Sequence, residues 1–162
     1  MRDRLLTWLL ACAGTCIVAL AVSCMVEQAR GAEPAWPPGA LNPAVTQATI
    51  HRTICKDGWT TTVRPPDSYT NKLKREQMAE RGLPGKPGDY EEDHFIPLEL
   101  GGAPRDPANL WPQPYASEWG ARKKDRLETT LHRKVCAGEV SLDAAREAVR
   151  KDWTKAYGEY VK

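Results

Sequence analysis

The sequence lacks most of the features that mark a strong nucleic-acid binder or a common hydrolase. Its net charge is only +2, far from the strongly basic balance of proteins that grip DNA electrostatically. No serine or cysteine lies in a recognisable nucleophile setting, which argues against a protease or a lipase. No Cys-x-x-Cys pair is present, which excludes a zinc knuckle. The sequence contains no internal repeat.

Residues 1–31 differ in composition from the rest of the chain. A short basic start is followed by an apolar run without charge over 5–23, and small residues follow at 29–31. This pattern is typical of an export signal, so we expect an exported protein that is periplasmic or secreted. The run is also close to the roughly 20 residues that span a bilayer. An uncleaved membrane anchor is therefore one alternative, and a lipoprotein cut before Cys24 is a weaker one.

Residues 32–45 are rich in proline and glycine and are expected to form an extended linker. The domain would then comprise residues 46–162. Removal of the signal leaves two of the five cysteines, Cys55 and Cys136. In an oxidising compartment these two residues are expected to form one disulfide, and two free buried thiols are the alternative.

The pattern of the domain predicts an α+β fold. Two short strands separated by an Asp-Gly turn are expected over 46–63, forming an N-terminal β-hairpin. The remaining expected elements are a helix over 68–81, strands over 90–96 and 109–111, a helix over 117–134 and a C-terminal helix over 141–160. Ser117 is the expected N-cap of the helix over 117–134. His132 lies on that helix without an acidic partner, and we expect it at the surface.

Residues 90–125 combine residue types that together can handle phosphate. Asp93 and His94 are adjacent, and a Gly-Gly pair follows at 101–102. Asn109 comes next, followed by the expected helix with its Arg and Lys residues. An acid, a histidine, a Gly-Gly turn, an asparagine and a basic helix, in this order, can build a small metal site that binds phosphate.

This pattern resembles the HNH endonuclease family, whose core is the ββα-metal fold. The residues that carry the resemblance are Asp93-His94, Ile96-Pro97, Gly101-Gly102, Asn109-Leu110 and Lys123-Lys124. More closely, the chain is similar to a subgroup of small exported bacterial proteins. That subgroup has an NLWP segment, here at 109–112, a KD-x-LE helix, here at 124–128, and a late VC-x-G, here at 135–138. The resemblance covers about residues 54–157 and implies a central ββα-metal, HNH-like unit.

The resemblance also implies roles for the site residues. One divalent ion, Mg²⁺ or Mn²⁺, would stabilise the charge that develops during phosphodiester hydrolysis. Asp93 would be a metal ligand, and His94 would be the general base that takes a proton from water. Asn109 would orient the His94 ring or reach the metal, and the structural alternative is that it closes a turn. The basic side chains expected to contact substrate phosphates are Arg122, Lys123 and Lys124.

The third signature position of the family, an Asn or His near the start of the helix, has no match in this sequence. By spacing it falls at Glu118 or Gly120. Gly120 has no side chain, whereas the Glu118 carboxylate suits a hard cation, so Glu118 is the candidate second metal ligand. The alternative is that Glu118 only stabilises the first turn of the helix and pairs with Arg122.

Two functions are consistent with the sequence. The first is metal-dependent phosphodiester hydrolysis by an exported, monomeric HNH-type endonuclease, with DNA favoured over RNA as the substrate. The second is a catalytically inactive HNH-like scaffold that acts as a binding or cell-envelope interaction module. The glycine at position 120 and the near-neutral charge favour the second function. Loss of cleavage in a folded His94→Ala variant is what the first requires.

Overall fold

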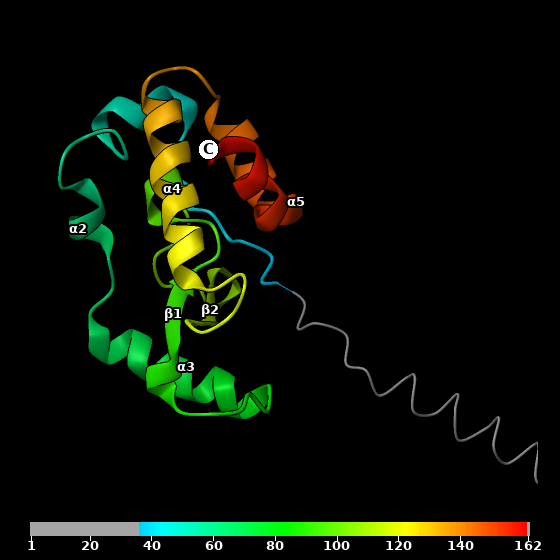
Figure 1. The fold of residues 1–162 in the computed structure, drawn as a ribbon. Coiled ribbons are helices and arrows are strands. Elements are labelled where there is room, and N and C mark those ends of the chain that lie inside the picture. The colour runs from blue at the N-terminus through cyan, green and yellow to red at the C-terminus, as the bar shows by residue number, and fades with distance from the viewer. Residues whose placement is uncertain (1–35, 162) are drawn as a thin grey trace, which may run out of the picture. The chain divides into compact units, whose positions relative to one another are not determined.

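The computed structural model describes residues 36–161, and Figure 1 shows their arrangement. Helices surround one small antiparallel sheet, so the expected α+β class is confirmed. Strands β1 (Tyr90–His94) and β2 (Leu110–Pro114) pair with His94 opposite Leu110. The expected export signal or anchor at 1–31 lies outside the described residues. Within residues 36–161, no helix combines the length and apolarity needed to cross a membrane.

Four α-helices and four short 3-10 turns make up the helical part of the described chain. The helices are α2 (Trp59–Val63), α3 (Asp67–Glu80), α4 (Ala121–Cys136) and α5 (Leu142–Tyr160). The turns are η1 (Gln47–Arg52), η2 (Pro87–Asp89), η3 (Leu98–Leu100) and η4 (Pro107–Asn109). The helices expected over 68–81 and 141–160 are confirmed within one residue at each end, and Ser141 caps α5 through a bond from the Ala144 N–H.

The β-hairpin expected over 46–63 is wrong. This segment forms η1, a turn and the short helix α2 instead. The Thr46 N–H donates to the Thr49 hydroxyl oxygen at 2.8 Å, which starts η1, and the Thr53 hydroxyl donates back to the Thr49 carbonyl oxygen. Gly58 does turn the chain, with φ of +74°, but it leads into a helix. Preference for strands reflects packing against neighbouring strands, and the only described sheet has two strands, neither of them in this segment.

Residues 36–45 are not the extended linker expected for this part of the chain. The Gly39 N–H donates to the Ala108 carbonyl oxygen at 2.9 Å, and the Asn42 N–H donates to the Gly101 carbonyl oxygen at 2.9 Å. Val45 is buried in the core. The segment therefore belongs to the folded domain, and it braces the loop between β1 and β2.

The core lies where α4 packs against α5 (Figure 1). Leu127, Leu131 and Val135 of α4 are buried, as their helical spacing predicts. The apolar stripe of α5 that faces them is also buried, comprising Leu142, Ala145, Val149, Trp153 and Ala156. The α4–α5 pair therefore forms a large part of the core, and both helices contact the turn η3 between the two strands.

Helix α5 contains one interruption that its periodicity does not reveal. Asp152 has φ of −169° and ψ of 95°, which is extended backbone. Its side chain accepts hydrogen bonds from the main-chain N–H groups of Thr154 and Lys155, each at 3.0 Å. An acidic side chain that accepts in this way caps a new helical segment. The apolar stripe continues across the kink because Trp153 and Ala156 stay buried.

Candidate functional site

Strand β1 directs neighbouring ionisable side chains to opposite faces. Because successive side chains alternate along a strand, Glu92 and His94 share one face and Asp93 lies on the other. The positive charge of Lys74, on α3, lowers the pKa of Glu92. Asp93 forms an ion pair with Lys124 of α4, with Oδ2 and Nζ 2.7 Å apart. The strand thus supplies two separate polar centres, one towards α3 and one towards α4.

The imidazole of His94 is held in one orientation by the main chain. Its Nε2 lies 3.0 Å from the Pro104 carbonyl oxygen. A carbonyl oxygen only accepts, so this bond assigns the proton to Nε2 and leaves a lone pair on Nδ1. Burial lowers the pKa of His94 from its ordinary value, against the opposing effects of the Pro104 bond and Asp93. The ring is therefore neutral near pH 7 and able to accept a proton.

A polar pocket of about 210 Å³ lies beside His94, between the start of α3 and the strand β1. Its charged lining comprises two cations, Arg64 and Lys74, and three acidic residues, Asp67, Glu91 and Glu92. Sites for drug-sized ligands typically occupy about 300–1,000 Å³. This pocket is smaller, so it suits a compact polar group such as one phosphate of a larger substrate.

Glu92 is the acidic counterpart of His94 in this pocket. Burial raises the pKa of Glu92 to about 8, and the opposing charge of Lys74 does not cancel that effect. Both of its carboxyl oxygens are buried and accept no hydrogen bond from the described residues. The pKa of Glu92 therefore favours a protonated carboxyl group near neutral pH, while His94 Nδ1 carries no proton. Two titratable groups with pKa values displaced in this way are suited to paired acid and base roles.

The second centre is a buried lysine between carboxylates. Lys124 is 1% exposed. Its ammonium pairs with Asp93 and Glu128 and donates to the His94 carbonyl oxygen at 2.7 Å. Burial opposes the charge on Lys124, but the two carboxylates outweigh it and raise the pKa of Lys124. Burial raises the pKa of Glu128, and the positive charge of Lys124 opposes that effect.

The residues expected to hold a divalent ion do not fit one in this arrangement. The Asp93 carboxylate is already paired with an ammonium. Glu118 is exposed and precedes α4, outside the first turn that was expected to contain it. Across residues 36–161, neither residue belongs to a group of three candidate ligands. The expected Asp93–Glu118 metal site therefore finds no support in the geometry.

The bonds of the Asn109 side chain agree with the structural alternative, in which this residue closes a turn. Its side chain is fully buried and bonded to main chain: Oδ1 accepts from the Ile96 N–H at 2.8 Å, and Nδ2 donates to the Ile96 and Ala103 carbonyl oxygens at 3.0 Å. None of these bonds reaches the His94 ring. Asn109 instead fixes the loop that carries the Gly-Gly pair. A Cβ on Gly102 would lie 1.8 Å from the Ile96 carbonyl oxygen, so no residue with a side chain fits at this position without a shift of the main chain.

The N-terminal end of α4 differs from the expected one. Gly120, not Ser117, is the N-cap, and a Cβ there would lie 2.4 Å from the Tyr115 carbonyl oxygen. Arg122 is exposed, as a residue that contacts substrate must be. Lys123 is half-buried, with its ammonium 4.4 Å from the centre of the Trp119 ring. The expected surface position of Lys124 is wrong, because that ammonium points inward.

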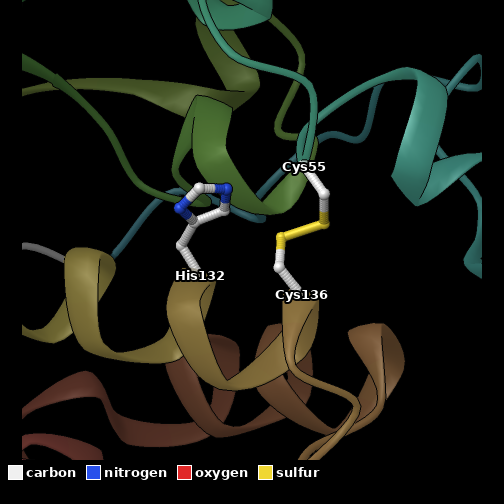
Figure 2. Close-up of side chains that lie close together, drawn as sticks. All are labelled: Cys55, His132 and Cys136. Carbon is white, nitrogen blue, oxygen red and sulfur yellow. A yellow bond between two sulfur atoms is a disulfide. The ribbon is translucent and has the colours of Figure 1, made fainter.

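The disulfide between Cys55 and Cys136 is confirmed. It joins the segment after η1 to the last residue of α4, and Figure 2 shows His132 beside it. His132 is half-buried rather than at the surface, and its Nε2 lies 2.8 Å from the Ile54 carbonyl oxygen. The candidate ligand atoms of Cys55, His132 and Cys136 all lie within 4.8 Å of one another, a possible metal-binding group. In the structure, the two sulfur atoms are bonded to each other.

The contributors to the two centres that sequence reasoning missed include Lys74, Glu92 and Glu128. Glu92 lies two residues before His94, so strand alternation alone places them on one face. Lys124 lies three residues before Leu127, on the same apolar stripe, and Glu128 follows it at the helical spacing of four. These spacings were the available signals. Lys74 had none, because its position depends on how α3 packs against β1.

Comparisons with known proteins assign neither a family nor a function to this chain. No family model matches the chain, and searches of curated proteins and of solved structures found no match.

Proposed function

We propose that this protein hydrolyses phosphodiester bonds of nucleic acid, with His94 as the general base, and that β1, β2 and α4 form a ββα unit of the HNH kind. The observation that carries the proposal is the setting of the His94 ring. Its Nε2 is held by the Pro104 carbonyl, its Nδ1 lone pair is free to accept a proton, and it lines a polar pocket with two cations.

The reaction balances with groups from this pocket. His94 takes one proton from a water molecule as the water oxygen attacks phosphorus. The bond from phosphorus to the leaving oxygen breaks, and Glu92 gives its proton to that oxygen. Arg64 and Lys74 offset the negative charge that develops on the other phosphate oxygens. Proton transfer from solvent to Glu92 and from His94 to solvent then restores both residues.

The two exposed or half-exposed basic residues at the start of α4, Arg122 and Lys123, are proposed to contact the substrate backbone. DNA stays our favoured substrate, and RNA is the one to test beside it. The low net charge of +2 predicts that binding is weak and that it depends on few phosphate contacts.

Nicking of supercoiled plasmid and cleavage of RNA by the purified full-length chain test the proposal. His94→Ala should abolish cleavage, because the proton acceptor is lost. His51→Ala is the matched control, since His51 is exposed and lies outside the pocket. Both variants are checked for the wild-type circular dichroism spectrum. Cleavage at the wild-type rate by folded His94→Ala would refute the role of His94.

A second function, a non-catalytic scaffold for a binding or cell-envelope partner, is favoured by one observation. The centre that should hold a metal contains the buried Lys124 ammonium instead. A scaffold predicts no cleavage of DNA or RNA by the wild-type chain in EDTA, Mg²⁺ or Mn²⁺. Cleavage that depends on His94 in any of these conditions excludes it.

A further inference from the structure

We propose that the ammonium of Lys124 is the resident cation of the Asp93 centre, occupying the place that a divalent ion would take between Asp93, Glu128 and the main chain of His94. The inference does not depend on the proposed hydrolysis, because it concerns what fills this centre. Binding and stability test it without any measurement of cleavage.

The geometry matches a three-oxygen cation site. Lys124 Nζ lies 2.7 Å from Asp93 Oδ2 and 2.7 Å from the His94 carbonyl oxygen, and it also contacts Glu128 Oε1. An ammonium has three N–H donors and no acceptor; Lys124 donates hydrogen bonds to the His94 carbonyl oxygen and to Glu128, and it forms an ion pair with Asp93. Two carboxylates and a main-chain carbonyl are the ligand types that hard divalent cations prefer.

The charges of the centre explain why one cation is required there. Lys124 and Asp93 are both buried, and without the ammonium two carboxyl groups would face each other across a space of low polarity. Such a pair must take up protons or bind a cation. The lysine meets this need from within the chain, and it blocks a divalent ion because an ion would have to displace a charged group from the same oxygens.

Lys124 also ties two elements together at the proposed base. It comes from α4, whereas two of its partners, Asp93 and His94, come from β1. A bound metal ion commonly makes a cross-link of this kind between a strand and a helix. Here a side chain makes it, so the position of β1 against α4 should be independent of added metal.

The test uses the thermal unfolding of the full-length chain in EDTA, Mg²⁺, Mn²⁺ or Ca²⁺. The wild-type Tm should be the same in all four conditions. Lys124→Ala leaves two carboxylates, a carbonyl oxygen and space for an ion, so its Tm should be lower in EDTA and should rise with ion concentration. At about 100 times the dissociation constant, the expected rise is roughly 5–10 °C. The Ca–O distance of roughly 2.3–2.6 Å is closer to the lysine contacts than the Mg–O distance of about 2.0–2.1 Å, so Ca²⁺ should act most strongly.

Two further variants separate this centre from other acidic groups. The double variant Lys124→Ala/Glu128→Ala removes one ligand and should lose the response to ions. Lys123→Ala removes a neighbouring lysine that contacts neither Asp93 nor Glu128, and its Tm should be the same with and without added ions. If Lys124→Ala folds only when an ion is present, the proposal is supported. An equal rise in the wild type, or a Lys124→Ala variant that no ion stabilises or refolds, would overturn it.

Discussion

Replacement of Asn109 by alanine tests whether this residue serves the fold or the chemistry. The structure gives its amide three hydrogen bonds, all to main-chain groups of Ile96 and Ala103. Alanine would leave three buried main-chain groups without these partners, and each such loss costs about 1–3 kcal/mol. Because such costs do not add fully, we expect Asn109→Ala to lower the free energy of unfolding by about 3–5 kcal/mol. This is a large share of the roughly 5–15 kcal/mol that stabilises a typical small domain.

Urea unfolding followed by tryptophan fluorescence measures this loss. Asn71→Ala is the matched control, because Asn71 is exposed on α3 and surface replacements usually change stability by less than about 0.5 kcal/mol. In conditions where Asn109→Ala remains folded, its cleavage rate per folded molecule should stay near that of the wild type. A variant with nearly unchanged stability and lost cleavage would refute the structural role and indicate that Asn109 takes part in catalysis.

Three other replacements probe the disulfide, the buried acid and the tight loop. Replacing both Cys55 and Cys136 by alanine should lower the free energy of unfolding by about 4–5 kcal/mol, from the loop of 81 residues that the disulfide closes; equal urea midpoints for the variant and the oxidised wild type would contradict this. For Glu92, the folded-state pKa of about 8 exceeds the ordinary 4.5, so wild-type stability should fall as pH rises from about 4.5 to 8. Glu92→Gln should remove that fall. At pH 9 its free energy of unfolding should exceed that of the wild type by about 2 kcal/mol, after discounting for the partial exposure of Glu92. Parallel stability–pH curves for the two proteins would show that Glu92 is not protonated in the fold. Gly102→Ala should prevent stable folding because its Cβ would collide with the main chain, and Gly88→Ala, with open space around it, should fold normally; a stable Gly102→Ala protein would show that the loop can move aside.

Helical periodicity predicted α5 well, because that helix is long and buries a continuous apolar stripe, and the glycine and proline after α3 marked where that helix ends. The Gly-Gly pair and the two flanking strands were also predictable, since the turn residues and Asn109 are close together in the sequence. The disulfide followed from counting the two cysteines that remain when residues 1–31 are removed. In these cases local sequence and tertiary packing favour the same structure.

The two main failures have a common physical cause. The segment at 46–63 has strand-forming residues, but its structure depends on side-chain bonds such as that from Thr46 to Thr49 and on burial of Ile50 and Ile54. Lys124 has a charge that predicts exposure, yet its place on the stripe with Leu127 turns it inward towards Asp93. In both cases the partners come from tertiary contacts that periodicity and residue class do not specify.

The disulfide makes residues 55–136 a covalent ring, and the whole His94 pocket and Lys124 centre lie within it. The connection from α3 to β1, at 81–89, is largely exposed, and exposed connections are preferred sites of protease cleavage. A single cut there opens the ring without separating its pieces. Lys74 and Gln77 would still bind α3 to the strands, through the carbonyl oxygens of Tyr90 and Leu110. The two pieces of the cleaved protein would stay joined by the disulfide. They would separate as two fragments on a denaturing gel only after the disulfide is reduced.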